Sequence, residues 1–369
     1  LDQVSKMSEE DIVEYWSSTL FDAGEDLFIR YPDIEPQGDD NLETKDLNFG
    51  WNYHLFGVDF YIEKVWNTYT RILGDTEYGS KLYASLYFDI GGTGITYEYK
   101  NYDQKYFIPT LSGAPIVYRE GNSTLASRNS HSINWGDEVG HQIELNRSIG
   151  SLNWLGNLSF SHKHDIEDES SNFINTTLNV IGYDKSIENY TLYPFRQFFS
   201  ELSGYVLDEK FYFKFGIDQL DKVKKDYGTL FLSTSAYTVP TMFTLNLGSG
   251  NSITSYIEYQ EKETDLLGSE LSSIVRDFYI QKYFSLTYNY SNFISLSLFY
   301  EDETHEDSIN KVSESDYWRG YDLTAELNST SQVSIFYGSQ KGGLVCANGV
   351  CAEQPGFDDG VKITLRTIF

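Results

Sequence analysis

The stretch KLYASLYFDIGGTGITYEY, residues 81–99, has the pattern of a β-hairpin. Apolar residues recur at every second position up to the glycine pair Gly91-Gly92, and the residues between them are mostly polar. Two adjacent glycines suit the tight turn that joins antiparallel strands. The apolar side is made of Leu82, Ala84, Leu86, Phe88 and Ile90. The stretch therefore predicts two antiparallel strands with one apolar and one polar face.

Further pairs of alternating segments follow this pattern along the chain. They are expected at about 43–54 with 57–68, 138–149 with 151–163, 195–207 with 209–218, 237–247 with 251–263, 273–288 with 292–302, and 317–327 with 331–340. Longer connections join the pairs, at about 102–136, 164–190, 219–236, 264–270, 303–316 and 341–359. Alternating short and long connections are typical of a bacterial outer-membrane barrel. The sequence predicts an all-β, transmembrane antiparallel β-barrel of about 16 strands, with short periplasmic turns and long extracellular loops.

The composition fits a barrel and excludes a helical membrane protein. No apolar run approaches the roughly 18 to 20 residues of a transmembrane helix. A barrel strand needs an apolar residue only at every second position, so 40% hydrophobic residues suffice. Tyr, Phe and Trp make up 16% of the chain and suit strands and interfacial girdles. The formal net charge of -28 would repel nucleic acid, so no nucleic-acid partner is expected.

The chain ends in GVKITLRTIF, residues 360–369, which is a further alternating strand. Because it follows a long connection, it runs toward the periplasmic side and places Phe369 at that rim as a membrane anchor. A terminal Phe on such a strand also resembles the signal read by the barrel-assembly machinery. We therefore expect the bacterial outer membrane as location. The expected partners are its lipid and lipopolysaccharide, the assembly machinery, and other outer-membrane proteins.

Three stretches resemble an uncharacterised family of outer-membrane barrels from Bacteroidota-like bacteria, known as a domain of unknown function. They are FIPTLSGAPIVYREGNSTLASRNSHSINWGDEVGHQIEL (107–145), WRGYDLTAEL (318–327) and SIFYGSQKGGLVCANGVCAEQPGFDDGVKITLRTIF (334–369). The resemblance covers residues 42–369. It implies the barrel fold and carries no activity, catalytic residue or cofactor.

The N-terminal segment, residues 1–41, is expected to lie apart from the barrel of residues 42–369. Ser8 with the acids after it resembles the start of a short helix. The pattern yields fifteen strands, and the first runs toward the periplasm, which leaves the N-terminus outside the cell. Either residues about 12–31 contain a sixteenth, ascending strand, or Leu1 is not the start of the natural polypeptide.

Two cysteines, Cys346 and Cys351, flank the turn Asn348-Gly349 in the last long loop. This turn can bring their sulfurs together, and a protein that crosses an oxidising periplasm is expected to form the disulfide. A metal site is the alternative, but zinc would need two further ligands and no CxxC or HxxxH partner is present. We expect the bridge to stiffen a loop tip, and we expect no metal.

Other chemistry in the sequence is weak. Only the HKHD run at 162–165 combines histidines with a carboxylate, and a solvated loop is its simpler interpretation. The acidic runs at 165–171 and 301–307 could hold divalent cations that bridge lipopolysaccharide, but they lack a regular ligand spacing. No catalytic motif is present, so an enzyme is not expected.

The polar face of the strands carries the functional information. A barrel of about sixteen strands is wide enough for an aqueous channel unless loops or another chain fill it. One residue, Lys282, falls on the lipid face between Ile280 and Phe284, where it could snorkel, face a partner or mark a bulge. The residues expected to face the lumen are Asp59, Glu63, Lys81, Tyr83, Tyr87, Asp89, Asp322, Glu326, Lys362 and Arg366.

Two function classes remain open from the sequence. One is a porin-like channel for small solutes, and the other is a structural scaffold barrel within an outer-membrane assembly.

Overall fold

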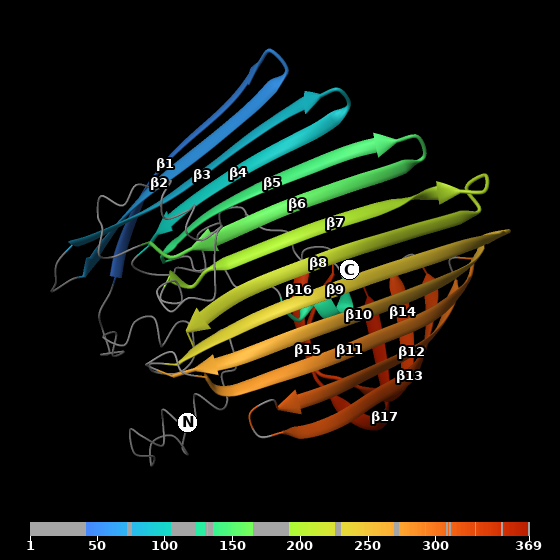
Figure 1. Cartoon of the computed structure of the whole chain (residues 1–369). Coiled ribbons are helices and arrows are strands. Elements are labelled where there is room, and N and C mark those ends of the chain that lie inside the picture. Colours follow the sequence, from blue (N-terminus) through green and yellow to red (C-terminus); the bar gives the residue numbers. More distant parts are fainter. Residues whose placement is uncertain are drawn as a thin grey trace.

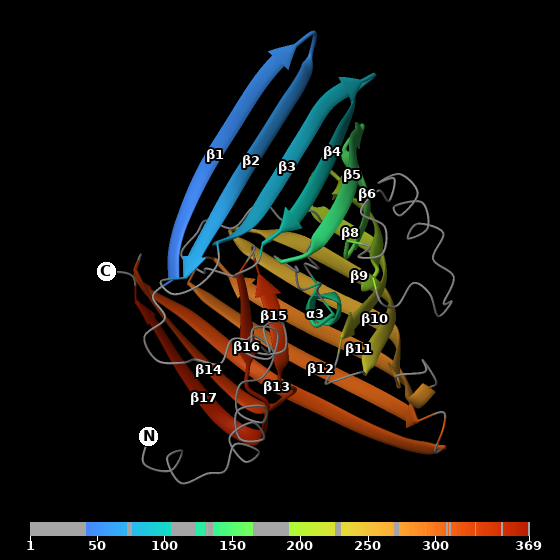
Figure 2. The ribbon, with the colours of Figure 1, turned by 90° about the vertical axis from the view of Figure 1, so that its left-hand side faces the viewer.

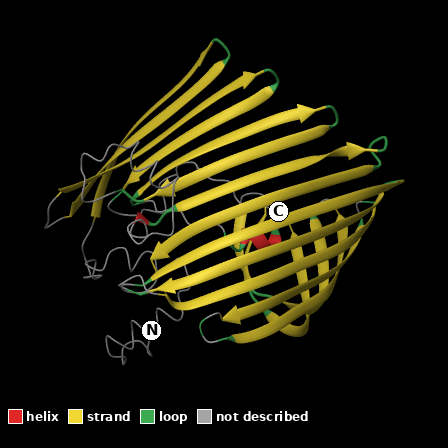
Figure 3. Cartoon of the chain, viewed as in Figure 1, coloured by secondary structure: helices red, strands yellow, loops and turns green. Residues whose placement is uncertain are grey.

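A computed structural model of the chain describes its strands and part of its connections (Figure 1). The described residues are 42–71, 76–104, 123–129, 131, 136–164, 192–225, 230–268, 273–291, 293–307, 309, 311–328, 330–347 and 350–367. Strands dominate them, and the short helix α3 (Thr124–Ser127) lies between β4 and β5 in the chain (Figure 3). The prediction of an all-β fold is confirmed. No helix in these ranges is long and apolar enough to span a membrane.

Fifteen strands form one sheet in which each strand pairs antiparallel with its neighbours in chain order. The sheet curls, so that one of its two faces turns inward (Figures 1 and 2). The strands are β1 (Leu42–Leu55), β2 (Val58–Arg71), β3 (Thr76–Ile90), β4 (Thr93–Asp103), β5 (Glu138–Ile149), β6 (Leu152–His162), β7 (Phe195–Val206), β8 (Phe211–Lys225), β9 (Phe231–Gly248), β10 (Asn251–Leu267), β11 (Ser273–Tyr290), β12 (Ile294–Asp307), β13 (Val312–Asn328), β14 (Ser331–Gln340) and β17 (Phe357–Thr367).

Tight turns lie at one end of the sheet, as predicted. Phe56-Gly57 and Gly91-Gly92 make two of them, and all four residues have positive φ. Glycine adopts this conformation without the strain of a β-carbon, which explains the glycine pair in the hairpin of residues 81–99. We call this side of the sheet the turn end, and the opposite side the loop end.

The predicted alternation of short and long connections is wrong in part. At the loop end, only the connections at 104–137, 163–194 and 341–356 are long, whereas β8 and β9 are separated by 226–230 and β12 and β13 by 308–311. The strands extend into segments that the sequence assigned to loops, and the acidic run 301–307 lies within β12. A strand can contain consecutive acidic residues, because successive side chains point to opposite faces of the sheet.

The cross-strand register divides the side chains into two faces. Across β2, β3 and β4, Glu63 pairs with Tyr83 and Tyr83 with Lys100, so these side chains share one face. The same continuous register, followed to β17, places Lys362 opposite Phe336 on that face. We call it the inward face, because α3 lies against it (Figure 2).

The outward face carries an exposed apolar belt. Along β12, outward Leu296, Leu298 and Tyr300 are all exposed, and outward Leu286 and Phe284 on β11 lie beside them. Exposed apolar surface on this scale is stable when lipid surrounds it. Strand alternation allows this in a highly charged chain, because the polar residues lie on the inward face. Such a belt on an antiparallel all-β chain matches the predicted location in the bacterial outer membrane.

Lys282 marks the edge of this belt and is not a misfit within it. It lies directly opposite Tyr259 and Asp302 in an unshifted part of the β11 register, so the bulge alternative is wrong. Its ammonium is 3.4 Å from the Asp302 carboxylate. Beyond this pair the outward face is mixed, with Glu261 and Thr304 on either side of Ile280. We call the level of Lys282 and Asp302 the rim of the belt.

The two outermost strands of the sheet, β1 and β17, both run from the loop end to the turn end. An ascending strand between them would keep every pairing antiparallel. The predicted sixteenth strand at about 12–31 and the predicted anchor Phe369 both lie outside the described residues, so they stay predictions.

The two cysteines lie opposite each other in a small separate hairpin, β15 (Gly343–Ala347) and β16 (Val350–Gln354), where Cys346 pairs with Cys351. The hairpin lies in the predicted connection and folds inward, because β15 contacts α3 inside the curled sheet (Figure 2). The disulfide itself stays a prediction.

We expect thiol labelling of the denatured, unreduced protein to find no free sulfhydryl, because cross-strand partners are within reach of a disulfide. Labelling after reduction should modify two thiols per chain. Stoichiometric labelling of both thiols without reductant would contradict the bridge.

Candidate constriction inside the sheet

Part of the connection between β4 and β5 folds inward and lies within the hollow of the sheet (Figure 2). Its described core is residues 123–129, which we call the inner segment. Ser123 caps α3, and its hydroxyl accepts a hydrogen bond from Ala126 N at 3.3 Å. A single helical turn is not stable alone in water, so the wall of the sheet must hold it.

Glu258 on β10 binds the start of this turn. Its two carboxylate oxygens accept hydrogen bonds from Thr124 N at 2.6 Å and Leu125 N at 2.8 Å. Glu258 is almost completely buried, and Leu125 is fully buried. A carboxylate is favourable there because the first N–H groups of a helical turn have no acceptor within the turn. Glu258 thus fixes the inner segment to the wall.

Arg128 fixes the other end of the inner segment to β12. Its guanidinium donates two hydrogen bonds to the two carboxylate oxygens of Glu301, one of them at 3.0 Å from Nη2. This bidentate geometry fixes the direction of the side chain as well as its position. The inner segment therefore spans from β10 to β12 with a charged contact at each end.

Further hydrogen bonds complete this attachment. The Asn129 amide donates to Gln260 Oε1 at 3.0 Å, and the Lys222 ammonium donates to the Asn129 carbonyl at 3.0 Å. Gln260 donates in turn to Thr238 at 2.6 Å. Lys222 lies on β8, Thr238 on β9 and Gln260 on β10, so these contacts join the inner segment to three neighbouring strands that are far from it in the sequence.

A second anchor lies where the same connection returns to the sheet. The Glu138 carboxylate is 2.6 Å from the Lys100 ammonium and 3.0 Å from His131 Nε2, with Lys100 and Glu138 both buried. The His131 ring stacks on Phe195 at 4.1 Å. Breaking one partner of a buried pair is costly, because the remaining charge stays desolvated.

The connection after β14 also turns toward this interior. Lys341 forms an ion pair with Glu303 on β12, and its ammonium lies 5.0 Å from the Trp318 ring centroid. A β-carbon on Gly343 would lie 3.7 Å from Arg128 Cδ. Two connections from distant parts of the chain therefore meet within the sheet and narrow its interior.

The ten residues predicted to face the lumen all lie on the inward face by register. Lys81 and Tyr83 are buried, whereas Tyr87, Asp89, Lys362 and Arg366 are exposed near the turn end. Asp322 accepts hydrogen bonds from Ser334 at 2.6 Å and Thr324 at 2.7 Å. The structure does not join these residues into one site, and their role in a channel stays a prediction.

Carboxylates dominate the inward face toward the turn end. Glu63 accepts from Asn48 at 2.9 Å and Tyr61 at 2.8 Å, and Glu98 accepts from Tyr83. Inward Asp59, Glu144, Asp218 and Glu326 continue this acidic character round the sheet. The described part of the inward face toward the turn end is therefore rich in acidic side chains.

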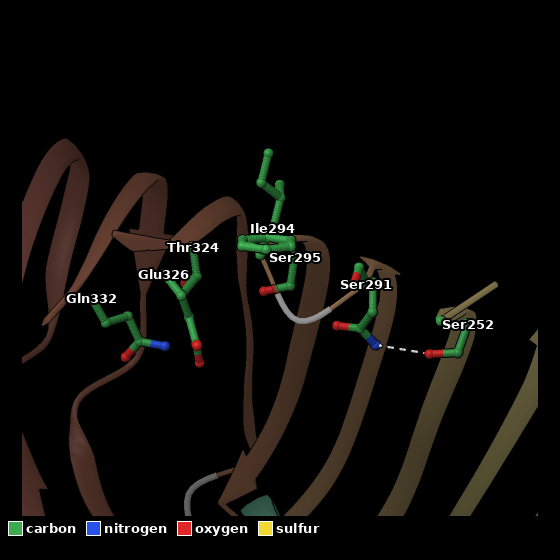
Figure 4. A pocket seen from close by; sticks show the side chains of 10 residues that line it. Ser252, Ser291, Ile294, Ser295, Thr324, Glu326 and Gln332 are labelled. Carbon is green, nitrogen blue, oxygen red and sulfur yellow. Dashed lines mark hydrogen bonds between the residues drawn. The ribbon is translucent and has the colours of Figure 1, made fainter. Parts of the chain in front are cut away.

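A hollow of about 430 Å³ lies on the inward face at the turn end, between β10 and β14 (Figure 4). Its lining is rich in hydroxyl and amide groups, and Asn289 donates to Ser252 at 3.2 Å. Glu326 supplies the carboxylate among the lining residues, while Ile294 points away from Glu326 and Gln332 (Figure 4). This hollow lies on the turn-end side of Glu258, the residue that binds the start of the inner segment.

In the HKHD run, His164 forms defined polar contacts with two residues of the sheet end. His164 Nδ1 is 2.6 Å from the Asp137 carboxylate, and His164 Nε2 is 3.2 Å from the Asn101 amide oxygen. Burial raises the pKa of Asp137, but the hydrogen bonds from the His164 ring and backbone outweigh it and hold that pKa below its usual range. Asp165 and the acidic run after it lie outside the described residues. Among the described residues, no group of three metal-binding side chains comes together.

The residues of the inner segment were missed by the sequence analysis. The pattern Ser123-Thr124 before Leu125 is a cap signal that could have revealed a helical turn inside a long connection. Glu258 and Glu301 follow the strand alternation like any inward residue. Nothing in their spacing joins them to residues 123–129.

No protein-family model matches the chain, and no curated protein matches it. The trimer form of OmpT, an outer-membrane protein of Vibrio cholerae, is 12% identical, with 88% of this chain and 96% of that chain covered and a TM-score of 0.42. An anion-selective porin from Comamonas acidovorans is 11% identical, with 89% and 100% covered and a TM-score of 0.35. OccK2 of Pseudomonas aeruginosa is 12% identical, with 88% and 91% covered and a TM-score of 0.30.

Proposed function

We propose that the protein is a porin-like outer-membrane channel for small solutes, narrowed by the inner segment. The observation that carries this proposal is the attachment of residues 123–129 to Glu258 and Glu301 inside a polar, curled sheet. A polar inward face with an apolar belt outside is typical of an aqueous pore in a membrane. No catalytic activity is part of the proposal.

The inward carboxylates should make the channel prefer cations. Fixed charges in a narrow passage raise the local concentration of ions of opposite sign, and salt screens this effect over about 10 Å at 0.1 M. The inner segment contributes little to the preference, because its Arg128 is neutralised by Glu301. The charges toward the turn end, including Glu63 and Glu98, are therefore the main source.

The purified protein should conduct ions in a planar bilayer, with a reversal potential that shows modest cation preference in a KCl gradient. The preference should weaken as the salt concentration rises, because screening shortens the range of the carboxylates. A preference for anions would be consistent with a channel, but it would contradict the expected cation preference of the inward carboxylates. The absence of current steps from correctly folded protein would contradict the proposal that the protein is a channel.

The alternative function is a structural scaffold barrel within an outer-membrane assembly. The observation that favours it is the filling of the interior by two connections, which could close the passage. Membership of the uncharacterised Bacteroidota-type family fits either function and rests on the three quoted stretches. Co-purification of a stoichiometric outer-membrane protein, together with a silent bilayer, would favour the scaffold.

A further inference from the structure

The inward face of β9–β13 carries two rows of small polar side chains near the turn end, and we call them the hydroxyl wall. The register contributes one residue from each strand to each row. The first row is Thr244, Thr254, Thr287, Ser297 and Asp322, and the second row, nearer the turn end, is Asn246, Ser252, Asn289, Ser295 and Thr324. Neither row contains Lys or Arg. The wall therefore offers hydroxyl and amide groups with one carboxylate and no fixed positive charge.

Hydrogen bonds across the strands hold the first row of the hydroxyl wall. The hydroxyl oxygens of Thr244 and Thr254 are 3.0 Å apart, and those of Thr287 and Ser297 are 2.8 Å apart. In each pair one O–H group donates to its partner, so the O–H group of the partner is left for a further acceptor. The wall therefore presents donors as well as acceptors on the inward face.

The second row borders the hollow of about 430 Å³ at the turn end. The Asn289 amide donates to Ser252 at 3.2 Å, which leaves its other N–H group and its carbonyl oxygen without a partner among the described residues. Glu326 and its cross-strand partner Gln332 add polar groups to the same hollow (Figure 4). The volume lies at the lower end of the roughly 300–1,000 Å³ of small-molecule sites.

Aromatic rings lie one inward level beyond the first row, toward the loop end. Tyr256 on β10 and Phe299 on β12 are both half-buried. The Phe299 ring stacks on Phe336 at 5.3 Å with an interplanar angle of 18°. A β-carbon at Gly320 would lie 2.7 Å from the Phe299 ring and 2.5 Å from the Phe336 ring, so this glycine allows both rings to lie against the sheet. The hydroxyl wall is thus bordered by flat apolar surfaces.

A neutral saccharide matches these features better than an ion does. Its hydroxyl groups both donate and accept, as the wall does, and its C–H groups can pack on aromatic rings. A cation would use only the acceptors, and the Asp322 carboxylate already accepts from Thr324 at 2.7 Å and Ser334 at 2.6 Å. An organic anion would be repelled by Asp322 and Glu326, with no Lys or Arg in the two rows to attract it.

We propose that the hydroxyl wall and its hollow form a binding site for a neutral mono- or disaccharide, on the turn-end side of the inner segment. The hydroxyl and amide groups of the second row would bind the sugar hydroxyls, and the aromatic rings would contact the apolar side of a sugar ring. The site rests on the proposed function, since the saccharide would be a solute of the channel. It names the class of solute that this function leaves open.

Equilibrium dialysis of radiolabelled maltose against the full-length protein, folded in detergent, tests the site directly. We expect saturable binding of one maltose per chain. Asn289→Leu should weaken binding at least about fivefold, because it removes the amide and keeps the approximate size of the side chain. Thr324→Val should weaken binding about threefold, because a methyl group replaces the hydroxyl. No saturable binding to the wild type, or equal affinity of the wild type and both variants, would overturn the proposal.

Asn153→Leu is the matched control. Asn153 also lies on the inward face near the turn end, but on β6 and outside the lining of the hollow. Its replacement should leave the affinity for maltose unchanged. An equal loss of affinity in Asn153→Leu and Asn289→Leu would show that maltose does not bind specifically at the hollow, and this would overturn the proposal.

The charge of the competing ligand gives a second test. Glucose should displace maltose, and glucuronate, which has a similar ring with a carboxylate, should displace it less well because Asp322 and Glu326 repel the negative charge. A higher KCl concentration should leave maltose bound. Displacement by KCl would assign the hollow to ions, and stronger displacement by glucuronate than by glucose would assign it to organic anions. Either result would overturn the proposal.

A bilayer measurement separates this proposal from the proposed function. Maltose should reduce the KCl current of the wild type and of Asn153→Leu in a saturable manner, and the saturable part should be much smaller in Asn289→Leu. A silent bilayer with intact maltose binding would contradict the channel and support the site. An open channel whose current responds equally to maltose in the wild type and in Asn289→Leu would contradict the site and support the channel.

Discussion

Replacing Glu258 and Glu301 together by alanine is expected to raise the single-channel conductance by roughly twofold or more, because the inner segment would lose both of its charged attachments to the wall. The first N–H groups of α3 would lose their acceptor, and the buried Arg128 would be left without a counter-ion. The segment would then leave its position and widen the passage. Current steps in a planar bilayer measure this effect.

The matched control is the double variant Asp59→Ala with Glu326→Ala. It removes the same number of inward carboxylates but leaves the contacts of the inner segment intact. We expect it to reduce cation preference with little change in step size. If the two double variants gave the same conductance, residues 123–129 would not be the constriction. If the wild type were silent and only Glu258→Ala with Glu301→Ala conducted, the segment would be a plug.

Leu298→Arg should lower the free energy of unfolding by about 2–4 kcal/mol, because it places a charge within the apolar belt. Leu298 is outward-facing and exposed, between Leu286 and Tyr321 on the neighbouring strands. Urea-induced unfolding of the protein in lipid vesicles, followed by tryptophan fluorescence, measures the change.

Thr304→Arg is the control for the position of the rim. Thr304 lies on the same face of β12 as Leu298, but beyond Lys282 and Asp302, where polar side chains lie beside Ile280. Its replacement should cost about 0–1 kcal/mol, as for a charge near the membrane interface. Similar costs for Leu298→Arg and Thr304→Arg would show that the belt does not end at Lys282.

Two connections that are far apart in the sequence are attached to the same strand, β12. The connections at 104–137 and 341–356 both contain cations that meet carboxylates on β12, namely Arg128 with Glu301 and Lys341 with Glu303. These acids belong to the run 301–307, most of which the sequence analysis assigned to the connection at about 303–316. Their strand position turns alternate acids inward, and this makes them partners for the inward connections.

The sequence by itself determined the local structure. Alternation of apolar and polar residues is a property of each strand alone, so it predicted the paired strands, the tight turns and the inward set from Asp59 to Arg366 without any knowledge of their neighbours. Glycine pairs such as Gly91-Gly92 likewise act within a few residues. The ends of the strands were less certain, since acidic segments such as 301–307 can be loop or strand.

Only the tertiary structure decided what lies inside the sheet. Arg128 meets Glu301, and Thr124 meets Glu258, across more than a hundred residues of chain. Such pairs depend on how the sheet curls and on which strands face each other, and no local pattern carries that information. The same holds for Lys282, whose place at the rim follows from its pairing with Asp302.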